Sequence, residues 1–202
     1  PLRTILERLH EAYSGSLSVE YMYSEDPEVR AWFQERLERG VAKPTREEQL
    51  RVLSKLVEAE AFENFLQTKY LGQKRFSLEG GESLIPLLDA VLDKAANNDL
   101  KGVAIGMAHR GRLNVLTNIA GKSYAQIFRE FSGTAAPYEG GSGDVKYHLG
   151  TEGVFTSDSG KQTQVYVAAN PSHLEAANTV LEGIVRAKQD VYREQGVEGH
   201  PV

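Results

Sequence analysis

Two short apolar runs, each followed by an amphipathic stretch, constrain the fold of this 202-residue chain more than any other feature. The first run is GVAIGM, residues 102–107, and the second lies within KQTQVYVAAN, residues 161–170. A short buried run that leads into a helical pattern is typical of a parallel strand and its crossover helix. We therefore expect an α/β fold with a mostly parallel sheet.

The residues before this region have helical patterns only. PEVRAWFQERLERG places Pro27 in a first turn, and TREEQLRVLSKL opens with Thr45 and Glu48 at the spacing of a capping box. Amphipathic packing explains these segments without any chemistry. We expect a helical segment over residues 1–70 and an incomplete α/β domain over residues 71–202.

The composition argues against several classes of protein. A net charge of −5 is unlike that of a general nucleic-acid-binding protein, and no apolar run approaches the length of about 20 residues that a membrane span needs. The chain has no cysteine, so disulfides and thiolate metal sites are excluded. Residues 101–150 nevertheless hold six Lys or Arg and three acidic residues, which either form an anion site or cluster by chance.

Three histidines draw attention, and two of them fall where an α/β sheet would place a ligand. His109 follows the first apolar run, His173 follows the second, and His148 closes a glycine-rich stretch. Ligands of open α/β sheets bind outside the carboxyl ends of the strands, and histidine is the side chain best suited to proton transfer near neutral pH. These positions favour a functional site over three structural histidines.

Other sites with cations or histidines fit less well. The histidines match no compact metal-binding spacing, and AGKS at 120–123 fails as a phosphate loop because the required first glycine is Leu116. Arg110 lies between His109 and Gly111, where a guanidinium could pair with a phosphate or carboxylate. A surface ion pair is the alternative for Arg110.

Four blocks, in this order, carry a family resemblance: RFSLEGGESLIP, GMAHRGRLNVL, GSGDVKYHLG and NPSHLEAA. Over residues 69–189 the chain resembles the decarboxylating first component of the 2-oxoglutarate dehydrogenase complex. The resemblance implies a thiamine diphosphate enzyme of the tricarboxylic acid cycle, which decarboxylates 2-oxoglutarate and passes a succinyl group to the lipoyl arm of a dihydrolipoyl succinyltransferase. It also implies a homodimeric full-length enzyme. We expect this enzyme in the bacterial cytoplasm, with the mitochondrial matrix as the alternative for a eukaryotic source.

The resemblance assigns roles to six residues at the expected site. In the family pattern, His109 and His148 contact the 2-oxo acid, Arg110 reaches the cofactor's diphosphate, Ser172 contacts the substrate, Leu174 lines the cofactor, and Phe76 separates users of 2-oxoglutarate from users of 2-oxoadipate. The resemblance makes residues 71–202 the first part of a diphosphate-binding domain.

One departure from the family pattern is large. The family binds Mg²⁺ through a Gly-Asp-Gly or Gly-Asp-Ala motif and a later Asn, which we expect beyond Val202, because this chain lacks them. We therefore expect a fragment of a longer protein that is inactive alone. A 2-oxoadipate dehydrogenase and a non-catalytic assembly module are the alternatives, and the presence of Phe76 and His148 argues against the first.

Overall fold

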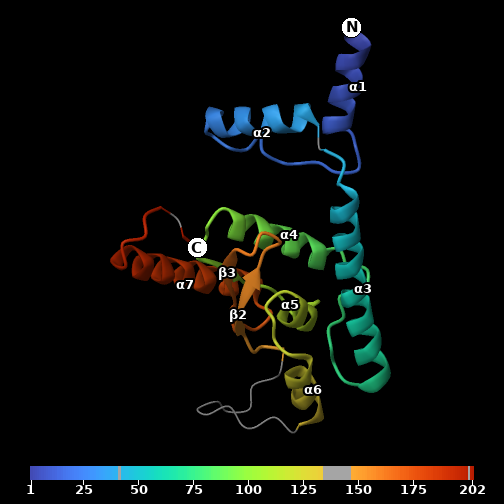
Figure 1. The fold of residues 1–202 in the computed structure, drawn as a ribbon, viewed down its shortest axis with the longest axis vertical. Helices are drawn as coiled ribbons and strands as arrows, with labels where there is room; N and C mark the ends of the chain where they lie inside the picture. The colour runs from blue at the N-terminus through green and yellow to red at the C-terminus, as the bar shows by residue number, and fades with distance from the viewer. Residues whose placement is uncertain (41, 134–146, 200) are drawn as a thin grey trace. The chain divides into compact units, whose positions relative to one another are not determined.

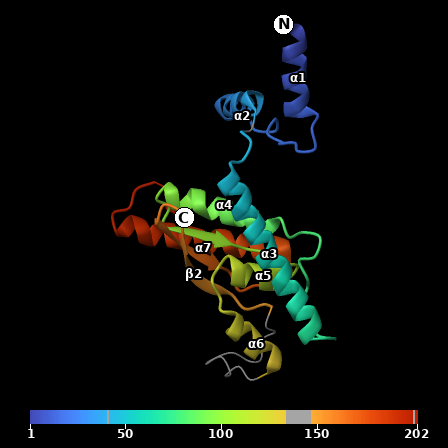
Figure 2. The ribbon, with the colours of Figure 1, turned by 45° about the vertical axis from the view of Figure 1, so that its right-hand side comes forward.

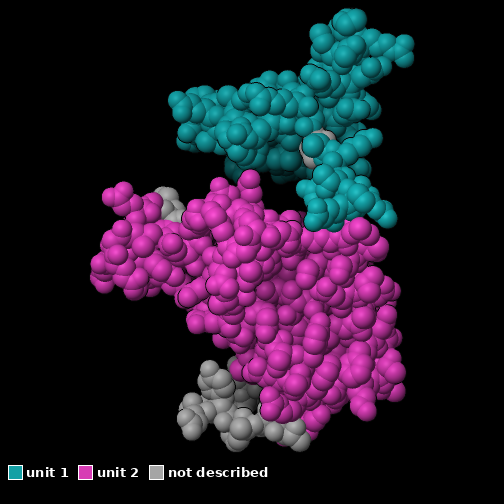
Figure 3. Space-filling model, in the orientation of Figure 1, with its two compact units in different colours: residues 1–49 teal, residues 50–202 magenta. Residues whose placement is uncertain are grey.

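The computed structural model describes residues 1–40, 42–133, 147–199 and 201–202. The chain forms two compact units, residues 1–49 and residues 50–202 (Figure 3). The domain boundary expected at residue 70 stays a prediction, although the later part of the long helix that precedes it packs within the second unit.

The first unit consists of helices whose ends follow their sequence signals. They are α1 (Leu2–Tyr13), α2 (Pro27–Arg39) and the start of α3 (Arg46–Lys69). The expected capping box at α3 is confirmed: the Thr45 N–H donates to Glu48 Oε2 at 2.6 Å, and the Glu48 N–H donates to Thr45 Oγ1 at 3.2 Å. These hydrogen bonds lower the pKa of Glu48.

The second unit is built on a three-stranded sheet with the order β1-β3-β2 (Figure 1). The strands are β1 (Gly102–Ile105), β2 (Thr151–Thr156) and β3 (Gln162–Val167). The α/β class is confirmed, but the sheet is mixed: β1 and β3 are parallel, whereas β2 and β3 are antiparallel. The turn of residues 157–161 is too short for a crossover, so it joins β2 and β3 as a hairpin.

The two faces of the sheet differ because side chains alternate along each strand. On β3, Val165 and Val167 are buried in a core with residues of α3, α4 (Leu84–Asn97), α5 (Arg112–Asn118) and α6 (Tyr124–Ser132). The opposite face carries Gln164 and Tyr166, beside α7 (Leu174–Glu194). Figure 2 shows α4, α7 and the sheet as neighbouring layers.

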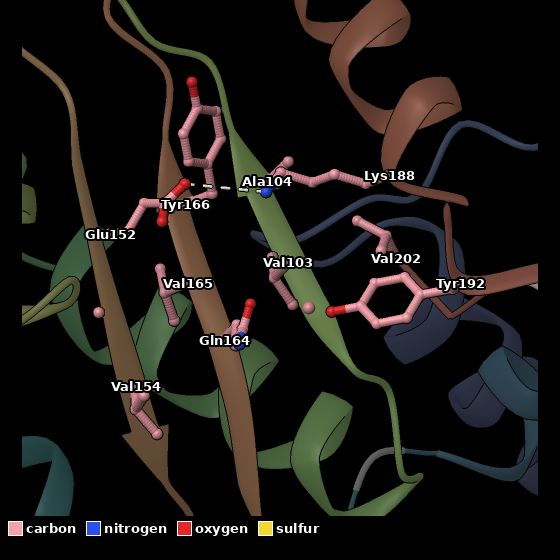
Figure 4. A pocket seen from close by; sticks show the side chains of 12 residues that line it. Val103, Ala104, Glu152, Val154, Gln164, Val165, Tyr166, Lys188, Tyr192 and Val202 are labelled. Carbon is pink, nitrogen blue, oxygen red and sulfur yellow. Dashed lines mark ion pairs between the residues drawn. The ribbon is translucent and has the colours of Figure 1, made fainter. Parts of the chain in front are cut away.

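A cavity of about 200 Å³ separates the sheet from α7 (Figure 4). Lys188 reaches from α7 across this cavity, where its Nζ lies 3.8 Å from a carboxylate oxygen of Glu152 and 4.7 Å from the ring centre of Tyr166. Both interactions join α7 to the sheet face that the main core does not cover.

The helix α3 is apolar on two sides, unlike an ordinary amphipathic surface helix. Ala59, Phe62 and Leu66 are buried in the core, whereas Leu53 and Val57 are more than half exposed. With residues of α6, the exposed side forms an apolar groove of about 720 Å³.

Arg51 ties α3 to the rest of the second unit. Its guanidinium pairs with Asp89 at 2.5 Å and Asp93 at 3.7 Å on α4, and with Asp158 in the turn between β2 and β3. That turn lies at the edge of the sheet where β3 begins, whereas His109 and His173 follow the strand ends at the other edge.

Candidate functional site

Three chain segments meet at the side of the sheet where the parallel strands β1 and β3 reach their carboxyl ends. We call this side the histidine edge. Because β2 runs antiparallel to β3, its first residue, Thr151, pairs with Val167 at the end of β3. The segment before β2 therefore reaches the same edge as the segments after β1 and β3. Backbone hydrogen bonds connect them: the Ala168 N–H donates to Ile105 O at 2.9 Å, and the Asn170 N–H donates to His148 O at 3.1 Å. The segments that carry His109 and His173 meet at one edge as predicted, and the segment that carries His148 joins them there.

Four rings form a cluster at this edge, namely those of Phe76, His109, Tyr147 and His148. His109 is central, because its ring centre lies 4.8 Å from Phe76 and 4.9 Å from both Tyr147 and His148. The two imidazoles are stacked at 28°, and the tyrosine ring meets both edge-on. The imidazoles of His109 and His148, which can both carry a proton, are therefore in contact beside the rings of Phe76 and Tyr147.

The electrostatic surroundings of His109 disfavour its protonated form. Burial lowers the pKa of His109, and the neighbouring charges of His148, Arg112 and His173 lower it further. Its Nε2 is buried without a hydrogen-bond partner among the described residues. A neutral imidazole with one unsatisfied nitrogen is suited to bind a polar ligand atom.

The backbone holds Phe76 beside His109 in a conformation that is rare for phenylalanine. Phe76 has φ +46°, and its carbonyl oxygen accepts the Gly111 N–H at 2.8 Å. Glu63 fixes the following turn by accepting the Leu78 N–H at 3.1 Å. Gly111 has φ +72°, and a Cβ on it would lie 2.4 Å from Leu78 Cδ1, so this approach needs glycine.

Arg110 directs its guanidinium toward the loop before α4. Its Nη2 donates to Glu79 O at 2.9 Å, and the residue is exposed. Hydrogen bonds from the Glu82 and Gly80 amides, with a smaller contribution from the charge of Arg110, lower the pKa of Glu82. Arg110 thus lies next to the histidine cluster with part of its hydrogen-bonding capacity turned to solvent.

Ser172 joins the site in a way that its sequence pattern did not indicate. Ser172 and Glu175 have the spacing of a capping box, but α7 begins at Leu174 after His173, without a side-chain cap. Ser172 Oγ instead accepts the His109 N–H at 3.0 Å. This bond holds the His109 backbone against the segment after β3. The side chain of Leu174, the other predicted residue in this segment, lies outside the described part of the structure.

Two buried polar residues at the same edge were not singled out from the sequence. Arg112 is fully buried, and its Nη1 lies 3.3 Å from the Asn170 side-chain oxygen. Asn170 Nδ2 donates to Met107 O at 2.9 Å and to Pro171 O at 2.7 Å. The sequence HRGR contains a second arginine, which could have drawn attention to Arg112. The spacing of the residues did not indicate that this arginine is buried.

No protein-family model matches the chain. The chain is 58% identical to the 2-oxoglutarate dehydrogenase E1/E2 component of Corynebacterium glutamicum over 203 residues, which cover 100% of this chain. It is 55% identical to the multifunctional 2-oxoglutarate metabolism enzyme of Mycolicibacterium vanbaalenii over 204 residues, again covering 100% of this chain. The chain belongs to the 2-oxoglutarate dehydrogenase family. It spans 16% of the length of these two relatives.

The site that the described residues of this family member form is a histidine-rich edge of the sheet. Within the described ranges, no three His, Asp or Glu side chains are grouped as metal ligands. The Mg²⁺ ligands expected beyond Val202 therefore stay a prediction. Among the described helices, none is both long and apolar enough to cross a bilayer.

Proposed function

We propose that the polypeptide containing this chain is a thiamine diphosphate-dependent 2-oxoglutarate dehydrogenase. It decarboxylates 2-oxoglutarate and transfers the succinyl group to the lipoyl group of a dihydrolipoyl succinyltransferase in the tricarboxylic acid cycle. The observation that carries the proposal is the meeting of His109, His148 and Ser172 at one sheet edge, in a chain that matches this family from end to end. The relatives are bacterial. We further propose, as the family resemblance implies, that the polypeptide is a homodimer in a bacterial cytoplasm.

The side chains at the edge fit an anionic cofactor. Arg110 is exposed beside the histidine cluster, where its guanidinium can bind a diphosphate, and Leu174 would line the cofactor. Thiamine diphosphate supplies, when bound with Mg²⁺, the electron sink that a 2-oxo acid needs in order to lose carbon dioxide. We expect the metal ligands in a part of the polypeptide other than residues 1–202.

The chain's own residues bind and orient the 2-oxo acid. His109 has a lowered pKa, and its Nε2 has no hydrogen-bond partner among the described residues. Its neutral ring therefore has an unused nitrogen for a substrate oxygen that displaces the atoms now covering it, and His148 is stacked against the ring. Ser172 accepts the His109 N–H, which leaves its hydroxyl hydrogen for a carboxylate. The aromatic rings of Phe76 and Tyr147 pack against His109.

Phe76 should set the length of the substrate that the site accepts. Replacing Phe76 with Ala removes a ring 4.8 Å from His109, which leaves room for the additional methylene of 2-oxoadipate. We expect the ratio of kcat/KM for 2-oxoadipate to that for 2-oxoglutarate to rise roughly tenfold. Steady-state kinetics of the full-length polypeptide measures this ratio.

Phe65→Ala is the matched control for that change. Phe65 is 44% exposed, compared with 38% for Phe76, but it lies on the apolar groove of α3. An unchanged ratio in Phe76→Ala, or an equal change in Phe65→Ala, would show that Phe76 does not select the substrate.

The proposed function is tested by decarboxylation assays on the full-length polypeptide with thiamine diphosphate and Mg²⁺. We expect turnover of 2-oxoglutarate to exceed that of 2-oxoadipate, and residues 1–202 alone to be inactive. A preference for 2-oxoadipate would identify the alternative dehydrogenase. No turnover of either acid would identify a non-catalytic assembly module.

A further inference from the structure

Arg112 is a fully buried cation that bonds to backbone oxygens from several parts of the chain. Its guanidinium donates to the carbonyl oxygens of Met107 at 3.3 Å, Leu149 at 3.0 Å and Ala168 at 2.5 Å. A longer contact of 3.5 Å reaches His148 O. Each of these oxygens belongs to a segment that leads into or out of a strand at the histidine edge.

The bonded segments are the ones that carry the candidate site residues. Met107 lies two positions before His109, Leu149 follows His148, and Ala168 begins the stretch that leads to Ser172. A shift of the guanidinium would therefore weaken the attachment of all three segments at once, although backbone hydrogen bonds also connect them. No backbone hydrogen bond within a single strand or helix could make this connection.

Asn170 bonds both to Arg112 and to two of the segments that Arg112 connects. Its side-chain oxygen accepts Arg112 Nη1, its Nδ2 donates to Met107 O, and its backbone N–H donates to His148 O. Arg112 and Asn170 therefore share Met107 O and His148 O as acceptors. We refer to this pair and its acceptors as the Arg112 brace.

The charge of the brace is balanced by dipoles rather than by an acid. Among the described residues, no carboxylate pairs with Arg112, and burial alone lowers the pKa of its guanidinium. An arginine remains charged at neutral pH even when buried. The site therefore holds a fixed positive charge, for which an anionic ligand would be the missing counter-charge.

We propose that Arg112 is a positioning residue, which with Asn170 holds His109, His148 and Ser172 in place and supplies a cationic background for an anionic 2-oxo acid. The substrate part of this inference rests on the proposed function. The positional part rests only on the hydrogen bonds of the brace. The two parts call for separate readouts.

The test uses the full-length polypeptide with Arg112→Met, Arg112→Lys and Asn170→Ala. The matched control is Arg51→Met. Arg51 is a partly buried arginine, with 24% of its side chain exposed, and it pairs with acids at the opposite edge of the sheet. Hydrogen–deuterium exchange reports the opening of each segment without substrate or cofactor. Thermal unfolding reports the loss of stability in each variant.

We expect faster exchange in 107–112, 147–150 and 168–173 together in Arg112→Met and Asn170→Ala. Arg51→Met should leave these segments unchanged and increase exchange near α4 and the 157–161 turn. Catalysis should report the same difference, since a misplacement of about 1 Å can lower a rate roughly 100-fold. We expect kcat/KM for 2-oxoglutarate to fall by about that factor in Arg112→Met, and to stay unchanged in Arg51→Met.

The pH profile separates the charge of Arg112 from its hydrogen bonds. Besides Arg112, the charged or titratable groups around His109 are His148 and Tyr147 from the turn before β2, His173 from the start of α7, and the adjacent Arg110. Removing the Arg112 charge raises the pKa of His109, so the acid limb of kcat/KM should move to higher pH in Arg112→Met. Arg112→Lys retains the charge and should leave that limb in place while still losing turnover.

Several outcomes would overturn the proposal. One is a fall in unfolding temperature, comparable in Arg112→Met and Arg51→Met, with unchanged kinetics and pH profile. Another is faster exchange confined to residues 107–112. If Arg112→Met does not fold, Arg112→Lys and Asn170→Ala carry the same comparisons. If the wild-type polypeptide does not turn over 2-oxoglutarate, the proposed function and the substrate part fail, whereas the exchange data still decide the positional part.

Discussion

Replacing His148 with Ala in the full-length polypeptide should lower the turnover of 2-oxoglutarate by about 100-fold or more. The imidazole is stacked on His109 at 4.9 Å, at the edge where the segments after β1 and β3 meet. The residue is only partly buried and lies in a turn, so its truncation leaves little cavity. We therefore expect a small change in unfolding temperature beside the large loss of kcat.

His10→Ala is the control for this change, because His10 is an exposed histidine on α1. It should alter neither turnover nor unfolding temperature. A loss of stability in His148→Ala that accounts for the loss of turnover would instead give His148 a structural role and favour the non-catalytic alternative.

Replacing Gly153 with Ala should cause the largest loss of stability of any single methyl addition considered for this chain. Gly153 is the third residue of β2, and a Cβ on it would lie 2.0 Å from Ala120 O, which is backbone. Neither β2 nor the chain after α5 can yield by that distance without breaking their packing. We expect a loss of about 3 kcal/mol in the free energy of unfolding.

Gly183→Ala is the matched control, because nothing lies within 4 Å of the Cβ position of Gly183 in the interior of α7. Alanine is the better helix former, so this change should stabilise by roughly 0.5–1 kcal/mol. Denaturant unfolding of both variants measures the difference. Equal stability of Gly153→Ala and wild type would contradict the packing of β2 described above.

The sequence predicted the elements whose signals are local. The strands β1 and β3 fall within the expected runs of residues 102–107 and 161–170, and the cap at Thr45 forms as predicted. The strand β1 ends earlier, at Ile105, because Gly106 lies close to Leu181 and the chain turns toward His109. Local sequence patterns were therefore sufficient to predict the type of these elements, but they located the ends of the elements less accurately.

Features that depend on long-range contacts were not predictable. TEGVFT gave no clear strand signal, since β2 is specified by its hairpin with β3, and this strand brings His148 to the site edge. Arg112, Tyr147 and Asn170 act through atoms far away in the sequence, which no spacing reveals. The site roles predicted for Arg110 and Leu174 depend on a cofactor and stay predictions.

The central claim is that the edge carrying His109, His148 and Ser172 binds the 2-oxo acid. The most direct measurement is a structure of the full-length polypeptide with thiamine diphosphate, Mg²⁺ and a non-cleavable phosphonate analogue of 2-oxoglutarate. We predict ligand oxygens within hydrogen-bonding distance of His109 Nε2 and the His148 ring, and the diphosphate beside Arg110. An analogue bound elsewhere, with both imidazoles in contact only with protein or water, would contradict the claim.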